Sequence, residues 1–187
     1  MGIPTLIKTL TASGSATLDF VDGTSDVTLD STYDEYMFVF TDIHPSAAAA
    51  EFLFQVNATD DAGGGYDTSL ITSTAFYTAH GEADGVEGPS YKGGYDLAQQ
   101  ASFQKLNENI GGENDESGAG ILHIFTPSST TYVKHFYARF HSYRSDNRAD
   151  TTFIAGYVND TTAIDEIRFK MSTGNIDAGV IQLFGIA

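Results

Sequence analysis

The sequence predicts an all-β protein, an antiparallel β-sandwich of the jelly-roll type, and three observations predict it. Apolar and polar residues alternate with a period of two in most apolar segments, where helices would show 3.6. Turn-forming residues recur at roughly ten-residue spacing, which is typical of sandwiches and barrels. The chain has 13 Phe and 10 Tyr but no Cys or Trp, so it suits pleated surfaces and lacks the Cys…Trp…Cys pattern of immunoglobulin domains.

The N-terminal half contains short alternating runs bounded by turn residues. Strands are expected at 5–10, 15–21, 25–30, 35–43 and 51–58. The run 35–43 carries apolar residues on both of its sides, which indicates an inner strand covered on both faces. The run 51–58 shows the alternation of a half-buried strand.

The C-terminal half continues the same pattern. Strands are expected at 69–79, 121–126, 131–143, 151–158, 164–172 and 179–186. Between the last two runs, Ser172 to Asn175 supplies turn residues, and Gly174 and Asn175 tolerate a positive φ at low cost. We therefore expect 164–172 and 179–186 to pair as an antiparallel hairpin that closes the sheet.

The middle of the chain departs from the strand pattern. Residues 58–119 are rich in Gly and acids and are expected to form an extended loop or insertion within a single domain of residues 1–187. Inside it, 96–112 places apolar residues near helical spacing, with Asp96 as a candidate N-cap and Gly111 as a stop. A short helix is expected there, with an irregular loop as the alternative.

The composition excludes several classes of partner. A formal net charge of −16 argues against duplex nucleic acid, because phosphate neutralisation supplies most of such affinity, and it argues equally against an anionic membrane surface. No apolar run approaches the ~20 residues of a membrane span, and the N-terminus lacks the apolar block of a signal peptide. Without cysteine there is no disulfide or thiolate metal site.

Catalytic signatures are missing from the sequence. None of the GxSxG, HExxH, P-loop and GxGxxG motifs occurs. The acids Asp60, Asp61 and Asp67 around Gly63–Gly65 offer oxygen ligands for a hard cation, but their spacing does not match an EF-hand, and a Gly-rich turn is the favoured interpretation. The sequence therefore predicts no catalytic residue, no cofactor, no metal site and no enzyme.

The strand at 131–143 provides a candidate protein interface. Its odd positions place several polar and aromatic side chains on one face, and Tyr and Arg are enriched at interfaces. Four of the nine Lys and Arg residues fall between 134 and 148, which predicts a basic patch able to meet acidic loops of a neighbouring copy. The predicted interface consists of Lys134, His135, Tyr137, Arg139, His141, Tyr143, Arg144 and Arg148.

Three blocks carry a family resemblance: YDEYMFVFTDIHPSAAAAEFLFQVN (33–57), GILHIFTPSSTTYVKHFYARFHSY (120–143) and AIDEIRFKMSTGNIDAGVIQLFGI (163–186). They cover about two fifths of the chain and lie in the predicted strands. Together they resemble small structural proteins encoded by tailed phages, particularly those of marine bacteria and cyanobacteria. The resemblance implies a virion component, either a decoration (cement) protein on the capsid or a part of the tail fibre apparatus, and it implies no catalytic residue.

The expected function is therefore that of a non-enzymatic virion structural protein, with capsid decoration preferred, assembled in the host bacterial cytoplasm. Its expected partners are further copies of itself, for example in a trimer, and other virion proteins such as the major capsid protein or tail proteins. One alternative is a tail fibre or tail accessory protein. Another is a carbohydrate-binding receptor-recognition module that uses Tyr91, Tyr95, Tyr137 and Tyr143 as stacking platforms. A hydrolase whose two carboxylates meet only in space is the third.

Overall fold

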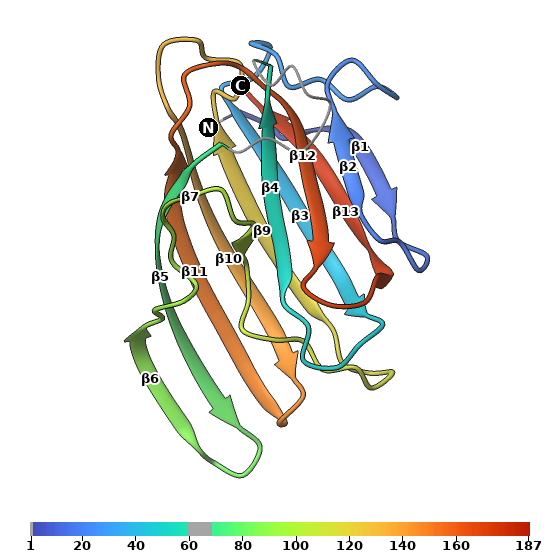
Figure 1. The fold of residues 1–187 in the computed structure, drawn as a ribbon. Coiled ribbons are helices and arrows are strands. Elements are labelled where there is room, and N and C mark those ends of the chain that lie inside the picture. The colour runs from blue at the N-terminus through green and yellow to red at the C-terminus, as the bar shows by residue number, and fades with distance from the viewer. Residues whose placement is uncertain (1, 60–68) are drawn as a thin grey trace.

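The computed structural model of the chain describes residues 2–59 and 69–187, and within them it contains two antiparallel β-sheets and no helix (Figure 1). The larger sheet has nine strands, in the order β1 (Thr5–Thr11), β13 (Ile176–Ile186), β3 (Glu35–Pro45), β9 (Gly118–Phe125), β10 (Lys134–Arg144), β11 (Arg148–Val158), β5 (Ile71–Gly81) and β6 (Val86–Tyr91), with β7 (Ala98–Gln100) paired to β5. The smaller sheet has four strands, in the order β2 (Leu18–Val21), β12 (Ile164–Met171), β4 (Phe52–Ala58) and β8 (Gln104–Lys105). The predicted β-sandwich is confirmed.

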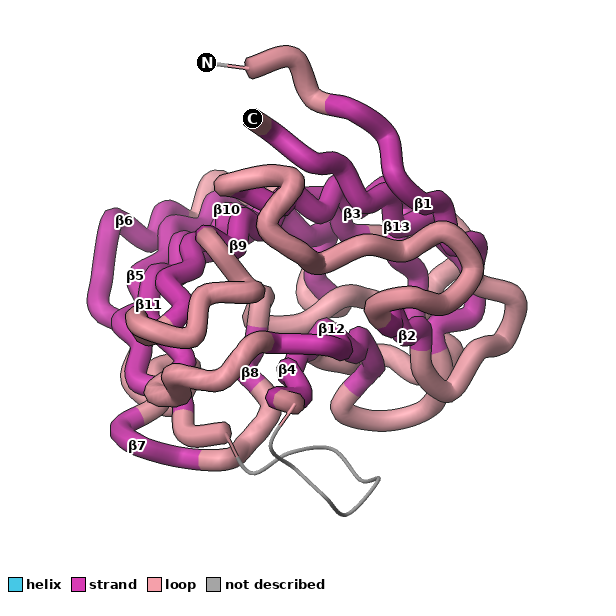
Figure 2. The backbone as a smooth tube through the Cα atoms, turned by 90° about the horizontal axis from the view of Figure 1, so that it is seen from above, coloured by secondary structure: helices cyan, strands magenta, loops and turns pink. Residues whose placement is uncertain are grey.

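The topology is that of a jelly roll with two insertions. Eight strands form two four-stranded sheets, β1-β13-β3-β9 and β2-β12-β4-β8, and along the chain they run in the sequence large, small, large, small, small, large, small, large. The β5–β7 segment and the β10–β11 hairpin are the insertions, and they add strands to one side of the large sheet. The large sheet is therefore wider than the small sheet that packs against it (Figure 2).

The core between the sheets is aromatic. The ring of Phe169 on β12 has its centroid 5.2 Å from that of Phe38, 5.3 Å from that of Phe40 and 5.7 Å from that of Phe52. All four side chains are almost fully buried. Alternation places such side chains on the inner faces of the central strands of both sheets, so the period-two pattern in the sequence is the direct cause of this cluster.

The terminal hairpin is the first correction to the sequence analysis. β12 pairs with β2 and β4 in the small sheet, whereas β13 pairs with β1 and β3 in the large sheet. The turn around Gly174, whose φ is +69°, crosses from one sheet to the other. The same turn residues serve a hairpin within one sheet and a connection between two sheets. The sequence therefore could not distinguish these two arrangements.

The predicted helix at 96–112 is the second correction. This segment forms β7, β8 and irregular chain whose backbone groups bond to strands and not to one another. The N–H of Leu106 donates to the carbonyl of Phe52 (2.8 Å), and that of Ile110 donates to the carbonyl of Ala50 (2.8 Å). The apolar side chains of Leu106 and Ile110 are buried, so the spacing reflected tertiary burial and not helical periodicity.

Two further expectations, for residues 25–30 and for the region 58–119, differ from the structure. Residues 25–30 form a turn followed by irregular chain and not a strand, although Val27 and Leu29 are buried in the core. The region 58–119, expected as an extended loop or insertion, contains β5 to β8 and the start of β9, so nearly half of its described part is sheet. The strand predicted at 69–79 is confirmed, because β5 covers Ile71–Gly81.

Candidate protein interface

The outer surface of the large sheet carries the candidate site. β9, β10, β11 and β5 lie side by side there, with their alternate side chains pointing away from the small sheet. We call these outward side chains the histidine–aromatic face. Its members are Thr72, Thr74, Phe76, Thr78, His80, Ala119, Ile121, His123, Phe125, His135, Tyr137, Arg139, His141, Tyr143, Ala149, Thr151, Phe153, Ala155 and Tyr157.

The charge of this face differs sharply from that of the chain. The sequence has 25 Asp and Glu residues and five His, yet none of the acids and four of the histidines belong to the histidine–aromatic face. Glu35 on the neighbouring strand β3 borders the face, and its carboxylate contacts His123 Nδ1. On a molecule of net charge −16, the outward side chains of these four strands therefore include no acid.

Cross-strand pairs build the centre of the face. Arg139 lies level with Ile121 on one side and Phe153 on the other, and the Phe153 ring stacks on Phe76 with centroids 4.9 Å apart. Tyr137 stacks on His123 at 4.4 Å. Burial and the nearby charge of Glu35 raise the pKa of the Tyr137 hydroxyl. These cross-strand pairs leave the side chains of Arg139 and Tyr137 exposed, with the rings of Phe153, Phe76 and His123 packed beside them.

Three open hollows follow β10 along this face. The first, of about 520 Å³, is bordered by Tyr137, Tyr157, Phe125 and the threonines of β5. The second, of about 420 Å³, contains Arg139 between Ile121 and Phe153.

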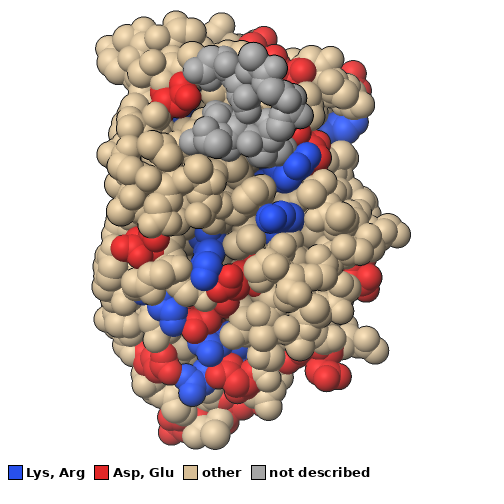
Figure 3. Space-filling model, in the orientation of Figure 1, with Lys and Arg blue, Asp and Glu red and all other residues tan. Residues whose placement is uncertain are grey.

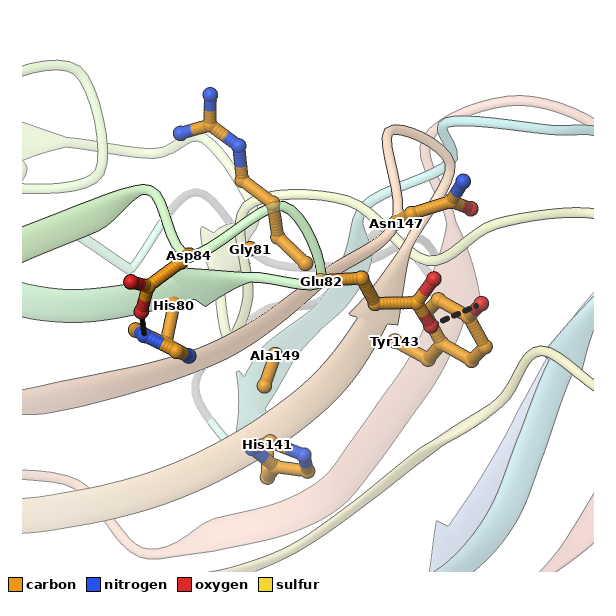
Figure 4. A pocket seen from close by; sticks show the side chains of 9 residues that line it. His80, Gly81, Glu82, Asp84, His141, Tyr143, Asn147 and Ala149 are labelled. Atoms are coloured by element: carbon orange, nitrogen blue, oxygen red, sulfur yellow. Dashed lines mark hydrogen bonds and ion pairs between the residues drawn. The ribbon is translucent and has the colours of Figure 1, made fainter.

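The third hollow, of about 480 Å³, lies at the end of the sheet (Figure 4). There His80 faces Asp84 at 3.3 Å and Tyr143 donates to Glu82 at 3.0 Å. Open, shallow hollows of this kind suit side chains of a partner better than an enclosed small molecule.

Lys134 does not belong to the interface that the sequence predicts. Its side chain is fully buried and points to the inner side of β10. The ammonium group donates to the backbone carbonyls of Thr162 and of Asp160, the latter at 3.2 Å. Lys134 therefore ties the segment after β11 to the core.

Arg144 and Arg148 do not form the predicted basic patch, because acids surround them. The Arg144 guanidinium lies 3.4 Å from Glu108, 3.0 Å from Asp146 and 3.5 Å from Asp150, while Arg148 contacts Glu87 and Asp146. Burial alone would lower the pKa of Arg144, but these carboxylates outweigh it and raise the pKa.

The same pairing extends over the surface viewed in Figure 3, where most blue side chains lie beside red ones. Among such pairs, Arg168 binds Asp19 at 2.7 Å, and Lys105 binds Glu51 at 2.9 Å. Arg139, by contrast, has no carboxylate partner among residues 2–59 and 69–187. It stands out as an unneutralised arginine in an acidic molecule.

The tyrosines proposed as sugar platforms do not assemble. Tyr95 is buried and donates to the carbonyl of Glu108 at 2.8 Å. Tyr91 is exposed, but it lies on the edge strand β6 and donates to Asp96 at 2.6 Å. Tyr143 is half-buried against Glu82, so Tyr137 alone of the four stands in the centre of the face.

Neither a metal-binding cluster nor a membrane-spanning helix occurs among the described residues. Within the described ranges, no group of three or more His, Asp or Glu side chains lies close enough to hold a metal ion. The candidate cation loop with Asp60, Asp61 and Asp67 falls outside the described residues. In the part of the chain that the structure describes, no helix has the length and apolar character needed to cross a membrane.

Comparisons with known proteins return no match: no family model, no curated protein and no solved structure is significantly similar to this chain. Any function must therefore be argued from the site itself.

The sequence located the centre of this face but not its neighbours. His135, Tyr137, Arg139 and His141 are exposed on one surface of β10, where the odd positions of the run 131–143 had placed them together. His123, Phe153 and Phe76 come from other strands, and only the pairing register brings them there. The sequence showed the alternation within 121–126, 151–158 and 69–79. It did not show which of these strands are neighbours, or that these side chains share one face of the sheet.

Proposed function

We propose that this chain is a non-enzymatic structural protein of a tailed-phage virion that self-associates through the histidine–aromatic face and also binds other virion proteins. Capsid decoration is the preferred location, with a tail fibre or tail accessory position as the alternative. The face is the single observation that carries the proposal. Tyr, Phe and Arg gather in its centre, acids are missing from it, and such a composition is typical of contact surfaces.

A mismatch between sequence pattern and burial supports this proposal. The run 35–43 has the two-sided apolar pattern of a strand covered on both faces, yet within the described residues no second layer of strands lies on its outer side (Figure 2). Met37 and Val39 are only half-buried there. A partner bound at this surface would supply the missing cover.

The proposal is tested on particles of the virus that encodes the chain. We expect the protein in purified virions at many copies per particle, by mass spectrometry, and we expect purified protein to bind empty capsids. Particles that lack it would contradict the proposal. Binding to isolated tails and not to capsids would instead select the tail location.

A second candidate, carbohydrate recognition, is favoured by the hollow between Tyr137 and Tyr157. Aromatic rings with nearby threonine hydroxyls offer both stacking and hydrogen bonds to a sugar. A glycan array with host surface polysaccharides tests it. Binding that is lost in Tyr137→Ala would support this function, and the lack of any hit would remove it.

A further inference from the structure

We infer that two copies of this chain dock face to face through the histidine–aromatic face, with Arg139 of each copy paired to Glu35 of the other. The inference rests on the proposed function and names the partner of that same site as a second copy. It specifies a two-fold dimer, in which the same patch serves both subunits and each contact occurs twice.

Charge selects a second copy over an acidic partner. Apart from Arg139, the histidine–aromatic face has no permanently charged side chain, so it presents little positive potential to attract a strongly acidic surface. Two molecules of net charge −16 repel each other wherever their acids meet. The histidine–aromatic faces carry no acid of their own, so docking through them brings few acids together, whereas contacts between acid-bearing surfaces would be repulsive.

The positions of Glu35 and Arg139 suit a two-fold axis. Glu35 lies level with Phe125, and Arg139 lies two strands away and four residues further along β10. At about 4.8 Å between strands and about 3.3 Å per residue, the two positions are roughly 16 Å apart. Their midpoint falls near His123, which stacks on Tyr137.

A two-fold axis that lies in the interface, passes over His123 and runs perpendicular to the line from Glu35 to Arg139 would place each Arg139 opposite the Glu35 of the other copy. The aromatic and imidazole rings near the axis would then meet their own counterparts. Arg139 would gain the carboxylate that it lacks within the described chain, and Glu35 would keep its contact with His123. The pairing therefore satisfies the charged groups that the contact would bury.

The surface is large enough for a stable contact. Six neighbouring strands, β13, β3, β9, β10, β11 and β5, are each 8 to 11 residues long. Together, the histidine–aromatic face on β9, β10, β11 and β5 and the adjoining outer surface of β3 and β13 measure roughly 29 by 33 Å, or about 950 Å². Stable protein interfaces bury about 800 Å² per partner, so the contact needs no additional segment.

Two single variants and their mixture test the inference by analytical ultracentrifugation. Arg139→Glu alone and Glu35→Arg alone each place like charges in both pairs, and each should weaken the dimer by about 30-fold or more per pair lost. A mixture of the two variants restores opposite charges in both pairs. We expect the wild type to be a dimer, each variant to be a monomer, and the mixture to form heterodimers.

Lys170→Glu is the charge-matched control, because Lys170 lies on β12 of the other sheet and the substitution makes the same change in net charge as Arg139→Glu. It should remain a dimer, and circular dichroism should show sheet in all variants. A monomeric wild type, or a mixture that stays monomeric, would overturn the inference.

The outcome separates this inference from the proposed function. A monomer that is still found in virions refutes face-to-face docking alone. A dimer with the expected charge dependence that is missing from virions supports the docking and refutes the virion role.

Discussion

Replacing Arg144 by methionine is expected to lower the free energy of unfolding by about 3–5 kcal/mol, because it leaves buried carboxylates without their cation. The Asp150 side chain is fully buried, and Arg144 is one of the groups that contact it, together with the hydroxyl of Thr152 at 3.2 Å. Among the described residues, the Glu108 carboxylate would then keep only its ion pair with Lys92. Urea unfolding of the variant measures the loss, since the midpoint falls with stability at constant slope.

Arg168→Met is the matched control, because Arg168 pairs with Asp19 on a partly exposed surface and such pairs contribute about 0–1 kcal/mol. An equal loss in both variants would contradict the account of the buried network. The pH dependence gives a second check. Burial raises the pKa of Asp150, so the folded state binds this proton more tightly than the unfolded state does.

The sign of the pH effect follows from that raised pKa. A carboxyl with a raised folded pKa contributes stability at acidic pH and loses it as pH rises through that pKa. Without Arg144 the pKa of Asp150 should rise further. We therefore expect the destabilisation of Arg144→Met to be largest at neutral pH and to shrink on acidification as Asp150 becomes protonated. A loss that grows in acid would contradict this explanation.

Replacing Phe169 by alanine is the other large effect, with an expected loss of about 3–5 kcal/mol. The ring is fully buried and packs against rings from both sheets, including Phe38 of the large sheet and Phe20 of the small sheet. Removing it leaves a cavity at the place where the two sheets meet. Thermal or urea unfolding should show the loss, and the sheet spectrum at low temperature should be retained.

Phe153→Ala is the matched control for that prediction. Its ring lies on the outer surface and stacks on Phe76, so in dilute solution its removal should cost about 1 kcal/mol. Comparable losses for Phe153→Ala and Phe169→Ala would show that the outer surface is covered in the monomer. That result would contradict the description of the histidine–aromatic face as open.

Periodicity predicted the sandwich because inner and outer side chains alternate whatever the topology. It could not predict which strands are neighbours. The run 164–172 buries Phe169 from the small sheet and the run 179–186 buries Leu183 from the large sheet, and the same local pattern would serve a hairpin. Pairing with distant strands decides between a hairpin and a crossing from one sheet to the other. The local pattern of one sequence does not show which distant strands pair.

The candidate site also was predicted only in part: the strand pattern predicted which side chains are exposed, but not their charged neighbours. The exposure of Tyr137 and Arg139 followed from their odd positions on one strand. The burial of Lys134 followed from its even position, but the clustering of basic residues in the sequence suggested a patch. Arg144 and Arg148 were expected to be available to a partner, yet Glu108, Asp150 and Glu87 neutralise them within the chain. These acids lie far away in sequence or on the opposite side of a turn, so composition alone could not locate them.

Hydroxyl-radical footprinting tests most directly whether the histidine–aromatic face is a contact surface. Tyr137 is 42% exposed in the face and Tyr132 is 71% exposed in the loop before β10, so the two tyrosines report on the contact and on its surroundings. On assembly, Tyr137 should become several-fold less reactive while Tyr132 keeps its reactivity. Tyr137 that oxidises equally fast in dilute and assembled protein would contradict the account.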